Sequence, residues 1–287
     1  MTGRGEMNRD EQIQVQGMRI HIIAAGEAGS PVLLLHGGGT DSARLSWSLA
    51  IPALASSHRV FAPDLPGYGE SERPPARYNT GFYLDFIQGL MDALHLEHAS
   101  LAGLSMGGAL ALGTALDTPA RVDRLALVDS YGLQRTVAMQ KLSYLMVKIP
   151  GIMESTWAGM RLNRGMAKAG MANVFHDLNR ISDDLLDDIF VEARKPHAGR
   201  AFTAYQREEV LWNGLRTVYL DRLGEIRIPT LIIHGRQDRA VPLIWAKMAN
   251  ERITGSRLEV IDGAGHWPQR EQPEQFNRIL VEFLKDS

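Results

Sequence analysis

Residues 100–112 read SLAGLSMGGALAL and place one serine, Ser105, among small and apolar residues. Leu101 and Ala102 are typical of the end of a buried strand, and the run at 107–112 is typical of an apolar helix. A role as helix cap would explain Ser105 but not the glycines around it. The glycines on both sides favour a second interpretation, a strained strand-to-helix turn that exposes the hydroxyl of Ser105 as a nucleophile.

Short apolar runs on either side of this stretch alternate with helical patterns. The runs typical of strands are Val32–Leu35, Val60–Ala62, Leu125–Val128, Thr230–Ile233 and Leu258–Ile261. Helical spacing covers residues 82–94 and 275–284, and two alternating segments within residues 13–24 predict an antiparallel hairpin. This alternation predicts an α/β fold with a mostly parallel sheet that helices cover on both faces.

Residues 132–224 interrupt this alternation with helical stretches only. Four methionines recur there at a spacing of seven: Met139, Met146, Met153 and Met160. Pro150-Gly151 prevents one continuous helix. We expect an inserted helical cap at 132–224, between core segments at 1–131 and 225–287. Its methionines either pack the cap onto the core or line an apolar substrate pocket, for which Met146 is the candidate.

The overall composition excludes several classes of protein. The 287 residues are 45% hydrophobic and 22% charged, with a formal net charge of −2. This balance provides no basic surface for nucleic acid or an anionic membrane. The absence of cysteine excludes disulfides, a cysteine nucleophile and cysteine-bound zinc. Residues 1–17 are polar and unlike a secretory signal, so we expect a cytoplasmic protein without a membrane span.

A serine nucleophile needs an oriented base, and one histidine has the expected position. His266 lies in a glycine-rich loop, GAGHWPQ, after the strand expected at 258–261. Asp238 in GRQDRAVP follows the strand expected at 230–233 and is the candidate acid that orients the imidazole. Asp129, after the strand expected at 125–128, is the alternative acid.

A glycine run at the end of the strand expected at 32–35 is suited to hold an oxyanion. His36-Gly37-Gly38-Gly39 lets backbone amides approach a ligand closely, because glycine has no side chain. The amide of Met106, directly after the nucleophile, would be the second donor. The sequence therefore predicts nucleophile, base, acid and oxyanion donors at the ends of neighbouring strands.

The chain resembles the α/β-hydrolase superfamily along nearly its whole length. The matching motifs are LLLHGGG, PDLPGYGES, AGLSMGG, GRQDRAVP and GAGHWPQREQPEQFNRIL. The resemblance implies an eight-stranded sheet with a helical cap inserted after the sixth strand. It also implies oxyanion donors at Gly38 and Met106 and a structural role for Asp64. No metal or organic cofactor is implied. A serine at 105 excludes the epoxide hydrolases and haloalkane dehalogenases of this fold, which use aspartate.

Within the superfamily, HGGG and GHWPQ are most similar to the carbon–carbon bond hydrolases of meta-cleavage products. Trp267 would match their pocket tryptophan. Leu104 stands where those enzymes commonly have asparagine, Thr40-Asp41 where they have Pro-Gly, and Ile189 where they have a substrate-binding arginine. A cationic anchor would then have to come from another arginine of the cap, for which the candidates are Arg180, Arg194 and Arg200.

Leu104 and Ile189 are apolar where a substrate with a carboxylate would need polar anchors. They favour a serine carboxylesterase that hydrolyses small to medium-chain esters through an acyl-enzyme. The alternative is a carbon–carbon bond hydrolase of 2-hydroxy-6-oxo-dienoates. A ligand-sensing protein with very slow turnover is a third hypothesis, which no sequence feature favours. The candidate substrate-binding residues are Gly37, Gly39, Leu104, Trp267, Met146 and Ile189. We expect a small-molecule ester or related acyl compound as the partner, with no nucleic acid and no membrane, and a homodimer stays open.

Overall fold

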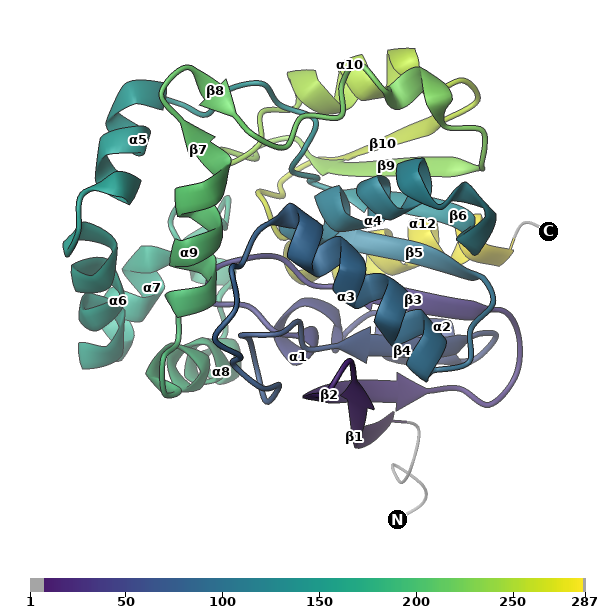
Figure 1. Ribbon diagram of the computed structural model, residues 1–287, viewed down its shortest axis with the longest axis horizontal. Coiled ribbons are helices and arrows are strands. Elements are labelled where there is room, and N and C mark those ends of the chain that lie inside the picture. Colours follow the sequence, from purple (N-terminus) through teal and green to yellow (C-terminus); the bar gives the residue numbers. More distant parts are fainter. Residues whose placement is uncertain (1–7, 286–287) are drawn as a thin grey trace.

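The computed structural model describes residues 8–285, and within this range eight strands form one sheet (Figure 1). Their order across the sheet is β1-β2-β4-β3-β5-β6-β9-β10. β2 pairs antiparallel with both β1 and β4, and the other neighbours are parallel. The strands are β1 (Asn8–Val15), β2 (Met18–Ala25), β3 (Pro31–Leu35), β4 (Arg59–Pro63), β5 (Ala99–Leu104), β6 (Val122–Val128), β9 (Thr230–Gly235) and β10 (Arg257–Ile261). The prediction of a mostly parallel sheet is confirmed.

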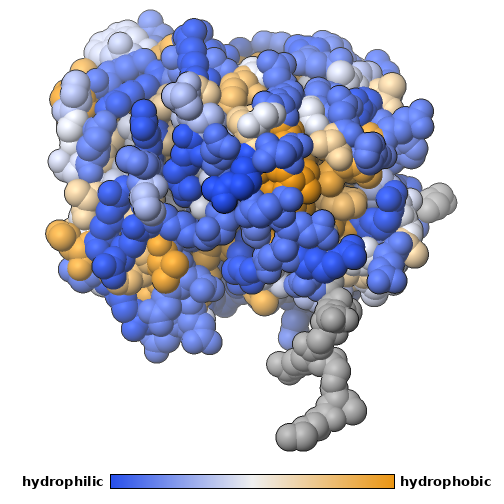
Figure 2. Space-filling view, turned by 60° about the horizontal axis from the view of Figure 1, so that its bottom comes forward, coloured by the Kyte–Doolittle hydropathy of each residue, from blue (hydrophilic) through white to orange (hydrophobic). Residues whose placement is uncertain are grey.

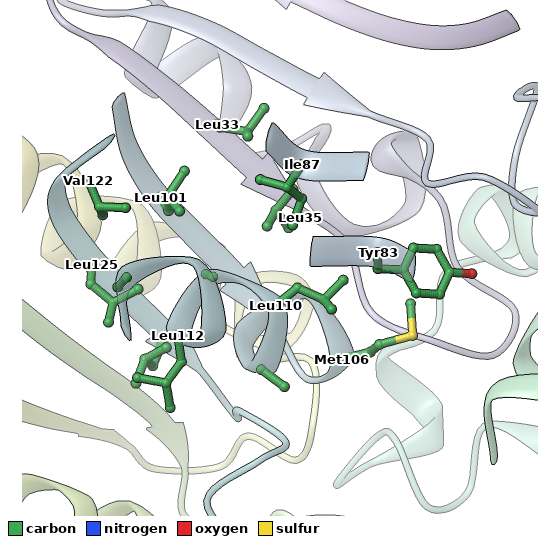
Figure 3. Close-up of a cluster of buried hydrophobic side chains, with 14 of the residues drawn as sticks. Leu33, Leu35, Tyr83, Ile87, Leu101, Met106, Leu110, Leu112, Val122 and Leu125 are labelled. Atoms are coloured by element: carbon green, nitrogen blue, oxygen red, sulfur yellow. The ribbon is translucent and has the colours of Figure 1, made fainter. Parts of the chain in front are cut away.

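The central strands are apolar on both faces because helices cover both faces of the sheet. Leu33 and Leu35 of β3 join one core cluster, and Val32 and Leu34 join the other. Figure 3 shows part of the first cluster, where α4 lies on the sheet next to residues of α3. Helices α3 (Thr80–Ala93), α4 (Met106–Asp117) and α10 (Ile244–Arg252) contribute to the first cluster. Helices α1 (Ala43–Trp47), α2 (Ile51–Ala55) and α12 (Pro273–Lys285) contribute to the second.

The predicted hairpin within residues 13–24 is present and longer than expected, since β1 and β2 pair from Asn8 to Ala25. Gln16 and Gly17 form the turn with φ angles of 51° and 80°. Two positive φ angles match the twist of the flanking strands. The expectation about a secretory signal at residues 1–17 concerns a segment whose first seven residues lie outside the described range.

Asp64 has the structural role that the resemblance implies. Its carboxylate accepts hydrogen bonds from the amides of Ala43 and Glu70 and from Nδ1 of His21, at 2.8 Å each. Burial alone would raise the pKa of Asp64, but the hydrogen bond from His21, the charge of His36 and the hydrogen bond from the Glu70 amide lower it to about 2. Asp64 therefore ties together the loops that follow β3 and β4.

Residues 132–224 form a group of helices that leaves the sheet after β6 and returns at β9 (Figure 1). The helices are α5 (Gln140–Lys148), α6 (Ile152–Leu162), α7 (Arg164–Gly170), α8 (Asp183–Arg194) and α9 (Arg200–Glu209). Pro150-Gly151 separates α5 from α6, as predicted. The sequence did not reveal a short antiparallel pair, β7 (Val210–Leu211) and β8 (Gly214–Leu215).

Hydrophobic residues form small separate patches on the face shown in Figure 2, which is otherwise mostly hydrophilic. Among residues 8–285, no helix is both long enough and apolar enough to span a lipid bilayer.

Candidate active site

Ser105 lies at a sharp turn between β5 and α4, with φ 51° and ψ −114°. A positive φ is costly for a residue with a side chain and persists only where the surroundings impose it. Here the Ser105 amide donates to the carbonyl of Val128 on β6, and the Ser105 carbonyl accepts from the amides of Ala109 and Tyr131. The neighbouring strand and the first turn of α4 thus hold the serine in its strained conformation.

The small residues around Ser105 are required by backbone packing. A Cβ atom on Gly103 would lie 2.2 Å from the carbonyl oxygen of Gly107. A Cβ atom on Gly107 would lie 2.3 Å from the carbonyl oxygen of Leu35, and one on Gly108 would lie 2.5 Å from Oγ of Ser130. These distances explain why glycines stand on both sides of the serine, because any side chain would push α4 away from the sheet.

His266 and Asp238 come together at the ends of β10 and β9. Nδ1 of His266 lies 2.7 Å from Oδ2 of Asp238, and Oδ1 of Asp238 accepts from the amides of Ala240 and Val241. Burial alone would raise the pKa of Asp238, but the charge and hydrogen bond of His266 outweigh it and keep that pKa below its ordinary value. Asp238 is therefore an ionised acceptor that orients the imidazole.

Asp129, the alternative acid, is fully buried beside this pair but is not bonded to His266. Its Oδ1 accepts from the amide of Gly235 at 3.0 Å and lies 3.5 Å from Nε2 of His234. Burial raises the pKa of Asp129 well above its ordinary value, and the negative charge of Asp238 adds to this effect. Of the two neighbouring carboxyl groups, Asp129 therefore holds its proton more tightly than Asp238, and the geometry favours Asp238 as the partner of the histidine.

The side chains of Asp129, His234 and Asp238 are close enough to be considered as a metal site. One potential ligand atom from each lies within 4.8 Å of the others. However, Oδ2 of Asp238 already accepts from His266, and the raised pKa of Asp129 opposes the ionised form that a metal requires. Asp129 is therefore better described as a second carboxyl group behind the histidine–aspartate pair than as a metal ligand.

The predicted oxyanion donors lie at the start of α4 and after β3. In the part of the chain that the structure describes, the amides of Met106 and Gly38 donate no hydrogen bond to a protein acceptor. The Gly37 amide, in contrast, donates to Oδ2 of Asp41 at 2.7 Å. A Cβ atom on Gly38 would lie 2.4 Å from the Phe202 ring, so the ring covers this glycine closely. The positions of Gly38 and Met106 agree with the prediction, which stays a prediction until a ligand tests it.

Ser105, Met106 and His266 line one cavity of 140 Å³, and α9 supplies much of its wall. The other lining residues are Tyr131, Gln134, Val137, Phe202, Tyr205, Gln206, Glu209, Val210, Leu215, Ala240 and Val241. Sequence analysis missed the α9 residues Phe202, Tyr205 and Glu209. The sequence contains no motif for them, because an amphipathic helix does not indicate which cavity its buried face meets.

The structure places three of the predicted substrate-binding residues in the apolar core beside the site. Leu104 and Ile189 are fully buried in the second core cluster, and Trp267 packs against Phe175 with ring centroids 5.7 Å apart. None of these three residues is among the described residues that line the cavity, and neither Gly37 nor Gly39 is among them. Leu104 ends a strand that is covered on both faces, and Ile189 is on the buried face of α8, so packing determines where both side chains point.

The structure also places Met146 elsewhere than predicted. Its side chain is 43% exposed on α5, next to Leu142 and Leu145, which are also exposed. The residues of α5 that face inward are Tyr144 and Val147, which pack near β7 and β8. The seven-residue spacing identifies a shared helix face but not the direction of that face, so the pocket assignment of Met146 is corrected.

The three arginines that were candidates for a cationic anchor do not supply a cation to the cavity. Arg180 donates to the carbonyl of Glu271, and the guanidinium of Arg194 lies 5.3 Å from the ring centre of Phe190. Arg200 lines a separate hollow with Trp157. Of the described residues that line the cavity with Ser105, none is lysine or arginine.

Comparison with known proteins identifies the family. Residues 30–273 match the family described as alpha/beta hydrolase fold. The chain is 31% identical to a 2-hydroxymuconate semialdehyde hydrolase of Pseudomonas sp., over 96% of this chain and 94% of that protein. It is 33% identical to an uncharacterized protein of Mycobacterium tuberculosis, over 94% of this chain and 79% of that protein.

A solved structure with a similar fold carries a related name. It is the meta-cleavage product hydrolase of Pseudomonas fluorescens, with a TM-score of 0.81 and 31% identity over 96% of this chain and 97% of that one. The family match covers more than half of the chain, and the sheet, the strained serine and the histidine–aspartate pair agree with it. This chain therefore belongs to the α/β-hydrolase family and is a hydrolase.

Proposed function

We propose that this chain is a serine-dependent hydrolase that cleaves a carbon–carbon bond next to a carbonyl group. The observation that carries the proposal is the strained Ser105, which shares a cavity with a histidine that is hydrogen-bonded to a buried aspartate. The names of the relatives at 31–32% identity support carbon–carbon cleavage over the ester hydrolysis that the sequence alone favoured. The location in the cytoplasm stays a prediction, as does a homodimer.

The site contains the groups that this reaction needs. His266 takes the proton of Ser105 as the hydroxyl oxygen attacks the carbonyl carbon, and the amides of Gly38 and Met106 stabilise the oxyanion. A 2-hydroxy-dienoate has to reach this step as its 2,6-dioxo tautomer, formed when the enol proton leaves the 2-hydroxyl and a proton is added at C5, so that the C2 carbonyl is conjugated with the C3–C4 double bond. The bond between C5 and C6 then breaks, its electron pair moves into that conjugated carbonyl group, and the resulting dienolate is protonated by His266. Water that is deprotonated by His266 finally releases the carboxylic acid from Ser105.

A carboxylesterase is the second candidate, and the cavity itself favours it. Its lining is mostly apolar and contains no lysine or arginine within the described range, which suits an uncharged ester better than a dienoate anion. Both candidates share the acyl-enzyme on Ser105, so they differ only in the group that leaves.

The test compares both substrate classes on the wild type and on Ser105→Ala. The first class is a 2-hydroxy-6-oxo-dienoate, supplied as the free acid and as its methyl ester, with the products of carbon–carbon cleavage identified by mass spectrometry. The second is a series of p-nitrophenyl esters from acetate to decanoate. Carbon–carbon cleavage that depends on Ser105 supports the proposal. Fast ester hydrolysis without cleavage of either dienoate form would instead establish the esterase.

A further inference from the structure

A second hollow, of 460 Å³, lies on the opposite face of α9 from the cavity that contains Ser105. The α9 residues that line the cavity are Phe202, Tyr205, Gln206 and Glu209, and those that line the hollow are Arg200, Thr203, Ala204 and Arg207. Each set follows the spacing of three and four residues that marks one face of a helix. The other described residues of this arginine hollow are Glu154, Trp157, Arg161, His197, Ala198 and Gly199, and none of them lines the cavity.

The arginine hollow contains more positive than negative charge. Three guanidinium groups line it, those of Arg161, Arg200 and Arg207, against the single carboxylate of Glu154. Arg207 pairs with Glu154 at 2.8 Å, whereas neither Arg161 nor Arg200 forms an ion pair within residues 8–285. The whole chain has a net charge of −2, so this local excess is not a general property of its surface. The hollow is therefore suited to an anion.

Two of these guanidinium groups are held in place by backbone carbonyls. Arg161 donates from Nε to the carbonyl of Ala193 at 3.1 Å and from Nη2 to that of Ala198 at 2.7 Å. Arg207 donates from Nε to the carbonyl of Val147 at 3.0 Å. In both side chains Nη1 has no acceptor in the part of the chain that the structure describes, and it is not buried. Accessible donors that are already fixed reduce the entropy that binding a ligand costs.

Arg200 has no such role in the structure. The hydrogen bonds of Arg161 and Arg207 connect helices of the cap, and this alone would explain those two residues. The side chain of Arg200 is exposed and forms no hydrogen bond or ion pair with any described residue. Its place beside two fixed guanidinium groups brings like charges together, which is unfavourable and is relieved when an anion binds.

The rest of the wall is small or apolar. Ala198, Gly199 and Ala204 line the arginine hollow together with the indole of Trp157. The indole Nε1 donates to Oγ1 of Thr203 at 3.1 Å, so the ring offers a ligand mainly apolar contact. A volume of 460 Å³ is within the usual range for small-molecule sites and exceeds the need of an inorganic ion.

We propose that the arginine hollow binds a small organic acid, with the carboxylate at the three guanidinium groups and the hydrocarbon part against Trp157. A planar guanidinium group donates two parallel hydrogen bonds to a carboxylate, which makes arginine the preferred partner of this group. The inference does not depend on the proposed function, because no residue of the hollow lines the cavity that contains Ser105.

Calorimetric titration of the wild type with benzoate tests the site. We expect one benzoate per chain with a Kd of about 1 mM or below, and no saturable binding of benzamide, which has the same shape without the charge. Inorganic phosphate, which lacks a hydrocarbon part, should bind about 10-fold more weakly than benzoate. Absence of benzoate binding, equal binding of benzamide, or tighter binding of phosphate would overturn the inference.

Arg200→Gln tests the charge of the arginine hollow without breaking a hydrogen bond of the described chain. We expect the Kd for benzoate to rise about 10-fold. Arg278→Gln on α12 is the matched control, because Arg278 is also exposed, forms no hydrogen bond or ion pair within the described range, and does not line the hollow. Its Kd should equal that of the wild type. An unchanged Kd in Arg200→Gln, or an equal rise in both variants, would contradict the inference.

A covalently modified enzyme shows which of the two sites benzoate occupies. Reaction with diethyl p-nitrophenyl phosphate releases p-nitrophenolate and leaves a diethyl phosphate group on Ser105, inside the cavity. Benzoate should bind to this modified protein with the Kd of the unmodified one, and loss of binding would overturn the inference by placing benzoate in the cavity. A protein whose Ser105 does not react would count against the proposed function, while the comparison of Arg200→Gln with Arg278→Gln would still decide on the hollow.

Discussion

Gly103→Ala should damage both activity and stability, and the size of the effect follows from the contacts around the glycine. The new methyl carbon would lie 2.2 and 2.4 Å from the carbonyl oxygen and carbon of Gly107, and 2.6 Å from the amide nitrogen of Gly108. Ordinary contacts begin near 3.4 Å. The first turn of α4 would therefore have to retreat by about 1 Å, since backbone atoms cannot rotate away as a flexible side chain can.

This movement would displace Ser105 and the Met106 amide together, because both belong to the same turn. A displacement of about 1 Å costs about 100-fold in rate, and overpacking a well-packed site costs about 1–3 kcal/mol of stability. We expect losses of about 100-fold in kcat and about 3 kcal/mol in the free energy of unfolding, at the upper end because the contacts are with backbone.

The assay combines turnover of p-nitrophenyl butyrate with urea unfolding followed by circular dichroism. Gly224→Ala is the control, because a Cβ atom there has no other atom within 4 Å, and it should leave both values near those of the wild type. A Gly103→Ala protein with wild-type kcat and an unchanged urea midpoint would refute the claim that backbone packing requires the glycine.

Three further variants test other parts of the site. Ser105→Ala should lower kcat by several orders of magnitude with an unchanged circular dichroism spectrum, and near-normal turnover would contradict its role as nucleophile. Burial raises the pKa of Asp129 in the folded wild type, whereas in the unfolded chain this pKa is near 3.8. Between these two pKa values only the folded protein holds the proton, so the free energy of unfolding falls by about 1.4 kcal/mol per pH unit as the pH rises. Asp129→Asn should remove that slope, so urea midpoints at pH 5 and pH 8 should favour the variant increasingly as pH rises, whereas parallel curves would show that the group ionises normally. Glu271 accepts from the amides of His176 and Gly265, so Glu271→Ala should lose about 2–4 kcal/mol in urea unfolding and also lower kcat; full stability would mean that water replaces the carboxylate.

The chemistry at the strand ends could be predicted from the sequence because its signals are local. Glycines around Ser105, a strand before Asp238 and a glycine-rich loop before His266 each indicate a backbone geometry within a few residues. The parallel pairing of the strands then brings their ends to one edge of the sheet. These positions needed no knowledge of side-chain packing.

The cavity wall could not be predicted, since it depends on how the helices of residues 132–224 pack against the core. The sequence of α9 indicates which of its residues share a face, but only the structure shows that Phe202 and Glu209 line the cavity that contains Ser105. The same limitation explains Met146, for which the spacing was informative and the direction was not. Ile189 was predicted as a pocket residue from alignment with relatives, but packing of α8 places its side chain in the core.

The hydrogen bond between the amide of His266 and the carbonyl of Val174, at 2.6 Å, has a consequence for how this protein can diverge. Residues 132–224 connect two strands that are neighbours in the sheet, so evolution could exchange this segment without changing the distance that the core must bridge. Yet the loop that carries the histidine rests on Val174, and a Cβ atom on Gly265 would lie 2.6 Å from that carbonyl oxygen. A transplanted segment would have to bring a loop of the same shape, so recombination between relatives should preserve residues 171–177 together with the histidine loop as one inherited unit.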